Sequence, residues 1–373
     1  MTTLFDSITV GAIDAPNRVF MAPLTRCRST MPHVPTPIMG EYYTQRASAG
    51  LIISEATGIS QQGLGTPFAP GIWTDEQTEA WKPIVEQVHK AGGKIMCQLW
   101  HMGRLVHSDF MNGDQPVSAS NIQAPGQIRT YQGKKEYEVP RPLAIDEIPG
   151  LLDDYANAAE NAKKAGFDGV QLHSANGYLI DQFIRSGTNV REDEYGGSIE
   201  NRIRLLGEVT QRLVDVWGND FVAVRLSPNG DSQGADDATP VDTFTAAAKL
   251  LDNIGIAFLE LREPPNFGTY GSTEVPPVSP DIRPLIKTPL VLNSDYNIDR
   301  AREALAAGHC DAISFGRPFI TNPDLPARLA SGAPLNGVAE GKSAWDFTPT
   351  WYSQGPEGYI DYPAMNEQEK ATA

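Results

Sequence analysis

Six consecutive residues, His173 to Tyr178, bring an imidazole, a carboxamide and a phenol together. They follow the apolar stretch Gly169 to Leu172, which has the form of a short buried strand, so they fall in the loop after it. His173 and Asn176 could each donate a hydrogen bond to one substrate oxygen, and the Tyr178 hydroxyl could deliver a proton. The types and spacing of these residues indicate a catalytic site.

Eight short apolar runs are spaced along the chain, and each precedes a segment of helical character. The runs predict strands at residues 19–21, 51–57, 95–99, 169–173, 221–226, 258–262, 290–293 and 312–315. The clearest helices are predicted at residues 75–91, 148–165, 198–217 and 240–253, each with a glycine close after its end. Eight strand-then-helix units predict an α/β fold, a closed (β/α)8 TIM barrel.

A doubly wound open sheet is the structural alternative to the barrel. Such a sheet usually has fewer strands, and a dinucleotide-binding one carries a glycine-rich turn. The nearest pattern here, Gly63-Leu64-Gly65, has no third glycine three residues later. The barrel is therefore favoured.

Two connections are longer than ordinary turns. Residues 101–149, after the third strand, are rich in Gly, Pro, Ser and Gln and predict an extended loop or hairpin that serves as a lid. Residues 263–280 form a second excursion, after the sixth strand. We expect one barrel domain over residues 1–363, followed by a polar, frayed tail at 364–373.

The composition limits the classes of partner. The chain has 373 residues, 40% of them hydrophobic, and a net charge of -16, which argues against binding nucleic acid or an anionic membrane. The beginning of the chain lacks an export signal, and no apolar run reaches membrane-spanning length. The three cysteines are widely spaced, which predicts no disulfide framework, and the histidines lack metal-ligand spacing. We expect a cytoplasmic protein with small-molecule partners and no metal, whose oligomeric state the sequence leaves open.

Polar residues gather where the predicted strands end, which is where barrel enzymes place their chemistry. Each of them alone has an ordinary structural explanation, such as a turn, core packing or an ion pair at the rim. Together they indicate a site: Thr25 after the first strand, Gln98 and Trp100 after the third, His173 after the fourth, Arg225 after the fifth, and Gly316 and Arg317 after the eighth.

In order and spacing, these residues resemble the old yellow enzyme family of FMN-dependent ene-reductases. The resemblance covers nearly the whole chain and rests on residues 17–26, 45–56, 98–101, 173–178, 193–202 and 358–363. It implies tightly but non-covalently bound FMN, with NAD(P)H as the reductant. Residue by residue, it also implies how the flavin is held.

For the flavin ring, Gln98 suits the N3–H and O2 edge, since a carboxamide both donates and accepts. By the resemblance, Arg225 faces N1 and O2, where reduction places negative charge, and Thr25 donates to O4. Pro23, Leu24 and Ala56 line the ring. For the phosphate, the resemblance points to the loops after strands seven and eight, with Asn293, Ser294, Asp295, Phe315, Gly316 and Arg317. Many family members have a glycine in the strand-seven loop, so its conformation here is an open question.

For the substrate, the resemblance implies that His173 and Asn176 bind the carbonyl or nitro oxygen of an activated alkene. Hydride would pass from FMN N5 to Cβ and a proton from Tyr178 to Cα, after NAD(P)H has reduced the flavin in the same pocket. Trp100, Tyr352 and Thr25 would shape the substrate side. Enones, enals, maleimides and nitroalkenes are the expected substrates. Two alternatives remain: a phosphate-binding barrel isomerase or aldolase, and a flavin-binding protein without turnover.

Overall fold

The computed structural model describes residues 2–230, 232–266, 273–337 and 350–365. Eight parallel strands close into a barrel, because the last strand pairs with the first and each of the others pairs with its neighbours. In order around the barrel they are β3 (Val19–Met21), β4 (Ile52–Ile53), β6 (Ile95–Trp100), β11 (Val170–His173), β12 (Val222–Leu226), β13 (Phe258–Arg262), β14 (Leu290–Asn293) and β15 (Ala312–Phe315). The predicted (β/α)8 barrel is confirmed.

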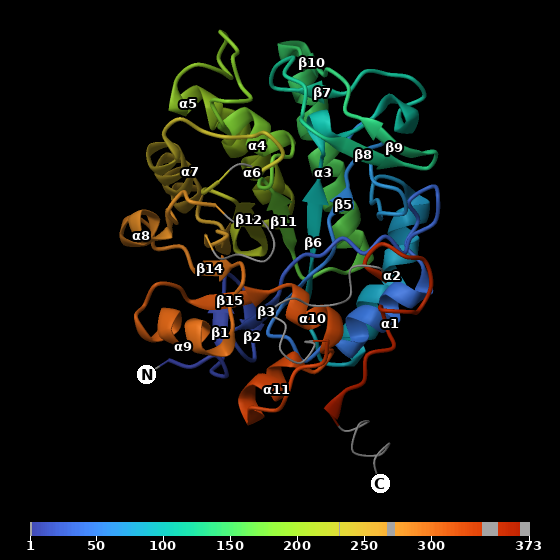
Figure 1. Ribbon diagram of the computed structural model, residues 1–373, viewed down its shortest axis with the longest axis vertical. Coiled ribbons are helices and arrows are strands. Elements are labelled where there is room, and N and C mark those ends of the chain that lie inside the picture. Colours follow the sequence, from blue (N-terminus) through green and yellow to red (C-terminus); the bar gives the residue numbers. More distant parts are fainter. Residues whose placement is uncertain (1, 231, 267–272, 338–349, 366–373) are drawn as a thin grey trace.

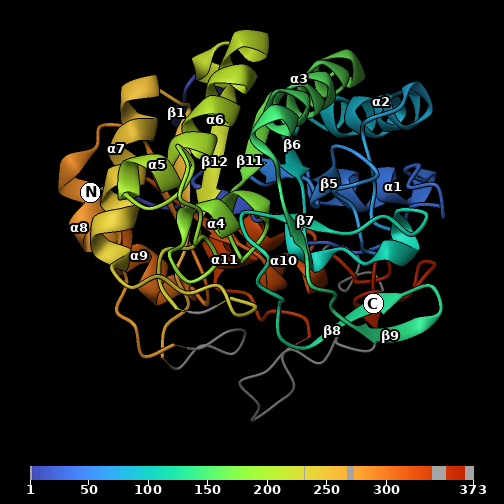
Figure 2. The same ribbon diagram turned by 90° about the horizontal axis from the view of Figure 1, so that it is seen from above.

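Helices surround the strands, as Figures 1 and 2 show. Buried side chains on one face of each main helix pack against the barrel, and polar residues face outward. The helices of the outer layer are α1 (Pro37–Gln45), α2 (Asp75–Lys90), α3 (Ile148–Ala165), α6 (Arg204–Trp217), α7 (Pro240–Ile254) and α9 (Ile298–Ala306). The shorter helices are α4 (Leu179–Ile184), α5 (Ile199–Arg202), α8 (Ser279–Ile282), α10 (Arg317–Thr321) and α11 (Leu325–Ser331). Single 3-10 turns cover Gly103–Leu105, Ser108–Phe110, Ile145–Glu147, Asn219–Phe221 and Arg283–Leu285.

A hairpin that the sequence analysis missed closes the amino-terminal end of the barrel. Its strands are β1 (Ile8–Val10) and β2 (Ile13–Ala15), and their apolar residues join the inner core formed by Phe20, Leu51, Ile53, Met96 and Val291. Gly11 turns the hairpin with a φ of 58°, and a Cβ there would lie 2.1 Å from the Asp220 carbonyl oxygen. The active end of the barrel is therefore the opposite, carboxyl end of the strands.

Two predicted elements are interrupted. The strand predicted at 51–57 is split into β4 and β5 (Thr57–Gly58), because side chains replace ladder bonds between them. The Ser54 hydroxyl accepts from the Gln98 N–H at 3.1 Å, and the Glu55 carboxylate turns away to bind the loop after β3. The helix predicted at 198–217 becomes α5 and α6 with a break at Ile203, although i to i−4 hydrogen bonds continue through the break.

The long connection after β6 contains the predicted hairpin. Strands β8 (Gln127–Thr130) and β9 (Gly133–Glu136) pair antiparallel, while β7 (Val117–Ser118) and β10 (Arg141–Pro142) pair in parallel. At the hairpin tip, the Tyr131 ring packs against Phe68 and Phe110, and its hydroxyl donates to the Met31 carbonyl at 3.1 Å. The hairpin is thus docked on the loop after β3, and its service as a lid stays a prediction.

Other expectations fall partly on residues that the structure does not describe. Within the predicted second excursion, residues 267–272 lie outside the described residues, and so do residues 366–373 of the predicted tail. Across the part of the chain that the structure describes, no helix is both long and apolar enough to cross a membrane. In the same part, no group of three His, Cys, Asp or Glu side chains is arranged to hold a metal ion.

Candidate active site

A cavity of about 720 Å³ opens at the carboxyl ends of the barrel strands. Its volume lies in the range of cofactor and small-molecule sites. The structure brings together around it all but one of the residues predicted for the site: Pro23, Leu24, Thr25, Ala56, Gln98, His173, Asn176, Tyr178, Arg225, Asn293, Ser294, Asp295, Phe315, Gly316, Arg317 and Tyr352. The exception is Trp100, which is buried behind the wall and packs edge-on against Tyr178 with ring centres 5.0 Å apart.

The floor of the cavity is a chain of hydrogen bonds between side chains of five barrel strands. Gln98 on β6 donates to Gln171 on β11 at 2.8 Å, and Gln171 donates to Glu260 on β13 at 2.8 Å. Arg225 on β12 pairs with Glu260 at 3.2 Å and donates to Asn293 on β14 at 2.9 Å. Each side chain is oriented by its neighbour, so the polar groups that face the cavity are held in place before any ligand arrives.

Burial is the main cause of the pKa shifts of the two basic groups at this floor, Arg225 and His173. Desolvation lowers the pKa of Arg225, and the neighbouring Glu260 carboxylate acts against that shift. Burial and the Arg225 charge together hold the pKa of His173 well below its usual value, so the imidazole is neutral at physiological pH. The Arg225 Nε and the His173 Nδ1 are buried and have no hydrogen-bond partner among the described residues. Buried polar atoms of this kind usually have partners, which indicates that a polar ligand completes the floor.

The wall beside the floor is the turn after β11. His173 and Tyr178 meet edge to face with ring centres 4.9 Å apart, and Asn176 between them has a left-handed φ of 61°. Its Oδ1 is buried and has no hydrogen-bond partner in the described part of the chain. An imidazole, a carboxamide and a phenol therefore face one space, in the arrangement that the sequence predicted.

The opposite edge of the cavity is the loop after β3, which carries Thr25. The Glu55 carboxylate accepts from the backbone N–H groups of Arg26 at 3.0 Å and Cys27 at 3.3 Å. Desolvation raises the pKa of Glu55, and these two hydrogen bonds oppose the rise. The Trp351 indole donates to the Thr25 carbonyl at 3.0 Å. The loop that carries Thr25 is thus held by Glu55 at the two residues after Thr25 and by Trp351 at Thr25 itself.

The loop after β14 lacks the glycine that many family members carry, but its backbone still adopts a conformation typical of glycine. Ser294 has a φ of 105° and Asp295 a φ of 49°, so two non-glycine residues adopt the conformation that glycine would take. Such strain persists where the surrounding structure enforces it, commonly at binding sites. The Asp295 carboxylate forms an ion pair with Arg317, which begins α10 after β15. Backbone donors and a guanidinium therefore meet at this end of the cavity.

Several site residues escaped the sequence analysis. Gln171 and Glu260 complete the floor network, and Arg262 and Trp351 line the cavity. Glu260 and Arg262 could have been predicted from the sequence. Both lie in the last three residues of a predicted strand, and a charged residue in an otherwise apolar run is unusual. No such signal marks Trp351, which comes from far along the chain.

These residues fit a flavin mononucleotide. The unpaired Arg225 Nε–H at the floor offers a donor to a ring edge, and the neutral Gln98 carboxamide suits a ring that both donates and accepts. The Ser294 and Arg317 end offers backbone N–H groups and the guanidinium of Arg317, which is paired with Asp295, to a phosphate. The apolar contributions of Ala22, Pro23, Leu24 and Ala56 suit the faces of an aromatic ring system.

Comparisons with known proteins agree with this fit. The NADH:flavin oxidoreductase / NADH oxidase family model matches residues 3–336. The solved old yellow enzyme homologue from Zymomonas mobilis is 60% identical, with a TM-score of 0.93 over 97% of this chain and 99% of that one. Morphinone reductase in complex with tetrahydroNAD is 42% identical, with a TM-score of 0.90 over 98% of each chain. The 12-oxophytodienoate reductase 7 of Oryza sativa subsp. japonica is 40% identical over 94% of this chain and 92% of its own length. The chain therefore belongs to the NADH:flavin oxidoreductase / NADH oxidase family, as an FMN-dependent oxidoreductase of the old yellow enzyme type that takes its electrons from NAD(P)H.

Proposed function

We propose that the protein is an ene-reductase that hydrogenates electron-poor C=C bonds conjugated to a carbonyl or nitro group: enones, enals, maleimides and nitroalkenes. The observation that carries the proposal is the placement of His173, Asn176 and Tyr178 on one wall of the cavity whose floor holds Gln98 and Arg225. The relatives named as morphinone reductase and 12-oxophytodienoate reductase support a substrate of this class.

When bound, FMN supplies a hydride, which it has received from NAD(P)H. For the cofactor, we propose that Gln98, Arg225 and Thr25 bind the polar edge of the ring, with Pro23, Leu24 and Ala56 against its faces. A positive charge beside the ring favours the reduced form, because that form carries more negative charge. The phosphate would be held by the backbone at Asn293, Ser294 and Asp295 and at Phe315 and Gly316, and by Arg317.

The substrate's oxygen is bound by His173 and Asn176. Because His173 is neutral, it donates a hydrogen bond without giving up a proton, and the two donors stabilise the enolate-like charge that develops on the oxygen. Tyr178 gives the proton to Cα from its position beside His173. Tyr352 and Thr25 border the space for the rest of the substrate, and Trp100 supports Tyr178 from behind.

The experiment that tests this division of roles separates the two half-reactions in the Tyr178→Phe variant. Anaerobic reduction of the flavin by NADPH should stay within about twofold of wild type, while reoxidation by 2-cyclohexenone should slow about 100-fold or more, the usual worth of a positioned acid. Tyr195→Phe is the matched control, since the Tyr195 hydroxyl donates to Glu208 away from the cavity. Unchanged reoxidation in Tyr178→Phe would remove Tyr178 from the proposal.

The alternatives weighed at the level of sequence are less well supported. A Schiff-base aldolase needs a lysine, and none lies among the described residues that line the cavity. A flavin protein without turnover would bleach with NADPH and stay bleached when the enone is added. The cytoplasm remains our proposed location, and the three buried cysteines, none of them in a disulfide, fit a reducing compartment.

A further inference from the structure

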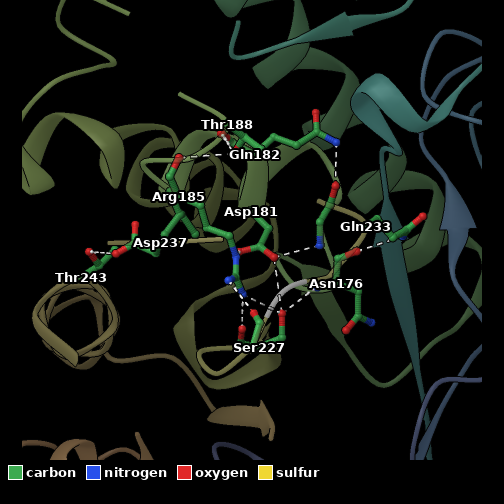
Figure 3. Close-up of polar contacts among 12 residues, drawn as sticks. Asn176, Asp181, Gln182, Arg185, Thr188, Ser227, Gln233, Asp237 and Thr243 are labelled. Carbon is green, nitrogen blue, oxygen red and sulfur yellow. Dashed lines mark hydrogen bonds and ion pairs between the residues drawn. The ribbon is translucent and has the colours of Figure 1, made fainter. Parts of the chain in front are cut away.

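A buried polar network lies behind the turn after β11, the wall of the cavity that carries Asn176 and Tyr178. The proposed function gives this network no role. Figure 3 shows it: Asn176, Asp181, Gln182, Arg185, Ser227 and Gln233 converge on the turn after β11. We propose that Ser227 and Asp181 are positioning residues, which fix the backbone of this turn so that Asn176 faces the substrate. The proposal rests on the proposed function, because it assumes that Asn176 binds substrate.

The backbone of the turn is left-handed at two successive residues. Asn176 has a φ of 61° and Gly177 a φ of 77°. Asparagine and glycine are the residues that adopt this conformation most readily, so the sequence permits the turn without fixing where it lies. Gly177 also has no room for a side chain, because a Cβ would lie 2.4 Å from the Ser232 carbonyl oxygen. Glycine is therefore required at this position, and contacts from outside the turn can fix where it lies.

Two side chains bind the turn's amide groups. The Asn176 N–H donates to the Ser227 hydroxyl at 2.7 Å, and the Gly177 N–H donates to the Asp181 carboxylate at 2.8 Å. The Ser227 hydroxyl in turn lies 3.4 Å from the same carboxylate oxygen. Ser227 follows β12 and Asp181 lies in α4, so two separate elements determine where successive residues of the turn lie.

The Asp181 anchor is itself buried and ion-paired. Asp181 pairs with Arg185 at 2.8 Å, and the two side chains are 0% and 1% exposed. Arg185 also donates to the Gly230 carbonyl at 3.0 Å and to the Ser227 carbonyl, so the guanidinium links α4 to the residues after β12. A buried ion pair of this kind adds little net stability, but it can specify one arrangement.

Two further contacts fix the carbonyl groups of the turn. Gln182 donates to the Gly177 carbonyl at 2.7 Å and to the Met102 carbonyl at 3.0 Å, and Gln233 donates to the Asn176 carbonyl at 3.1 Å. Both peptide groups around Gly177 are therefore fully bound. By contrast, these contacts involve only the backbone of Asn176 and not its carboxamide, whose Nδ2 is the donor that a substrate oxygen needs. The network thus secures the backbone while leaving the functional group available to a ligand.

Ser227→Ala tests the proposal, because Ser227 does not line the cavity. Its loss removes the acceptor for the Asn176 N–H at 2.7 Å, together with two longer contacts of 3.4 Å to Asp181 and Arg185. The flavin of the holoenzyme would be reduced with dithionite, which bypasses the nicotinamide, and reoxidised by 2-cyclohexenone in a stopped-flow instrument. We expect the rate at low enone concentration to fall about 10-fold, since small displacements of a positioned group cost one to two orders of magnitude. The midpoint potential of the bound flavin should stay unchanged.

Thr188→Val is the matched control. The Thr188 hydroxyl is equally buried and donates to the Gln182 and Arg185 carbonyls at the end of α4, but it does not touch the turn. The Thr188→Val substitution should lower the thermal midpoint by about as much as Ser227→Ala does, and it should leave the rate of flavin reoxidation at the wild-type value. Ser227→Thr, which keeps the hydroxyl, should restore most of the rate. If Ser227→Ala yields no holoenzyme, Ser227→Cys replaces it under the same criteria, since sulfur is a weaker acceptor of similar size.

A double-mutant cycle separates positioning from general damage. If Ser227 acts through Asn176, Ser227→Ala should slow reoxidation less than about twofold further in an Asn176→Ala background. If the rate effects of Ser227→Ala and Asn176→Ala multiply in the double variant, or if Ser227→Ala reoxidises as fast as Thr188→Val, the positioning role is overturned and the proposed function is not affected. Wild-type reoxidation in Asn176→Ala itself would instead overturn the proposed function, and the inference with it.

Discussion

The floor of the cavity and the C-terminal segment beside it, residues 350–360, are both held by buried polar contacts, but of opposite kinds. On the floor, side chain binds side chain, in the chain from Gln98 through Glu260 to Arg225. In the C-terminal segment, side chains from the start of the protein bind backbone carbonyls. Arg26 donates to the Trp351 and Gly358 carbonyls at 3.2 and 2.7 Å, and Arg28 donates to the Thr350 and Trp351 carbonyls at 2.9 and 2.7 Å.

The difference bears on function as well as on architecture. A floor of mutually paired charges sets the electrostatics that a flavin would experience, so damage there should change its potential. The C-terminal segment contributes Trp351 and Tyr352 to the cavity but no charged group paired with the floor. Damage to its arginine anchors should therefore change substrate binding and leave the potential alone.

The largest expected effect comes from breaking the floor. Arg225→Ala leaves Glu260 as a buried carboxylate without its cation, which should lower the free energy of unfolding by about 3–5 kcal/mol. It should also yield protein with little bound FMN, and any bound flavin should have a lower potential. Chemical denaturation and a potentiometric titration measure these two results. Arg225→Lys keeps the charge and should be milder; a normal potential in Arg225→Ala would contradict the assignment of the floor.

Releasing the C-terminal segment should have a smaller and different effect. Arg28→Ala removes donors from several carbonyls at once. It should cost about 2–3 kcal/mol, given roughly 1 kcal/mol for each of the two short bonds, to Thr350 at 2.9 Å and Trp351 at 2.7 Å, and less for the longer ones. KM for 2-cyclohexenone should rise several-fold as Tyr352 loses its support. A potential shifted as far as in Arg225→Ala would show that the two regions are not separate.

Restoring glycine in the phosphate loop should stabilise the protein slightly. Ser294→Gly removes the cost of a left-handed serine, of the order of 1 kcal/mol, partly offset by the greater freedom of glycine when unfolded. The thermal midpoint should rise by a degree or two, with the flavin potential unchanged. A lower midpoint would mean that the serine side chain makes a contact more valuable than the strain it carries.

The smallest effect is on pH dependence. Because the folded pKa of His173 is depressed, the unfolded chain takes up this proton first as the pH falls through about 6.5. The stability of the folded state should therefore fall below that pH, and His173→Asn should remove part of the slope between pH 6.5 and 5. Reoxidation by the enone should show no histidine titration between pH 6 and 9. A step near pH 6.5 would contradict a neutral His173.

The same comparison explains what could be predicted from the sequence. Gln98, Arg225 and His173 were found because polar residues at the ends of apolar strands are unusual, and a barrel brings strand ends together. The C-terminal segment had no such signal, since any residue offers a carbonyl to Arg28; Tyr352 was found only through resemblance to a family. The N-terminal hairpin was missed because its two strands are only three residues long. The break after Ile53 was missed because it depends on partners far along the chain, with Ser54 binding β6 and Glu55 binding the loop after β3.

The most direct test of the account is the visible spectrum of the purified protein under anaerobic conditions, before and after NADPH and again after 2-cyclohexenone. The account predicts a flavin band that bleaches with NADPH and returns in full with the enone, with one equivalent of cyclohexanone formed. A protein that stays bleached when the enone is added would contradict the proposed reaction, and a colourless protein that FMN cannot reconstitute would contradict the site itself.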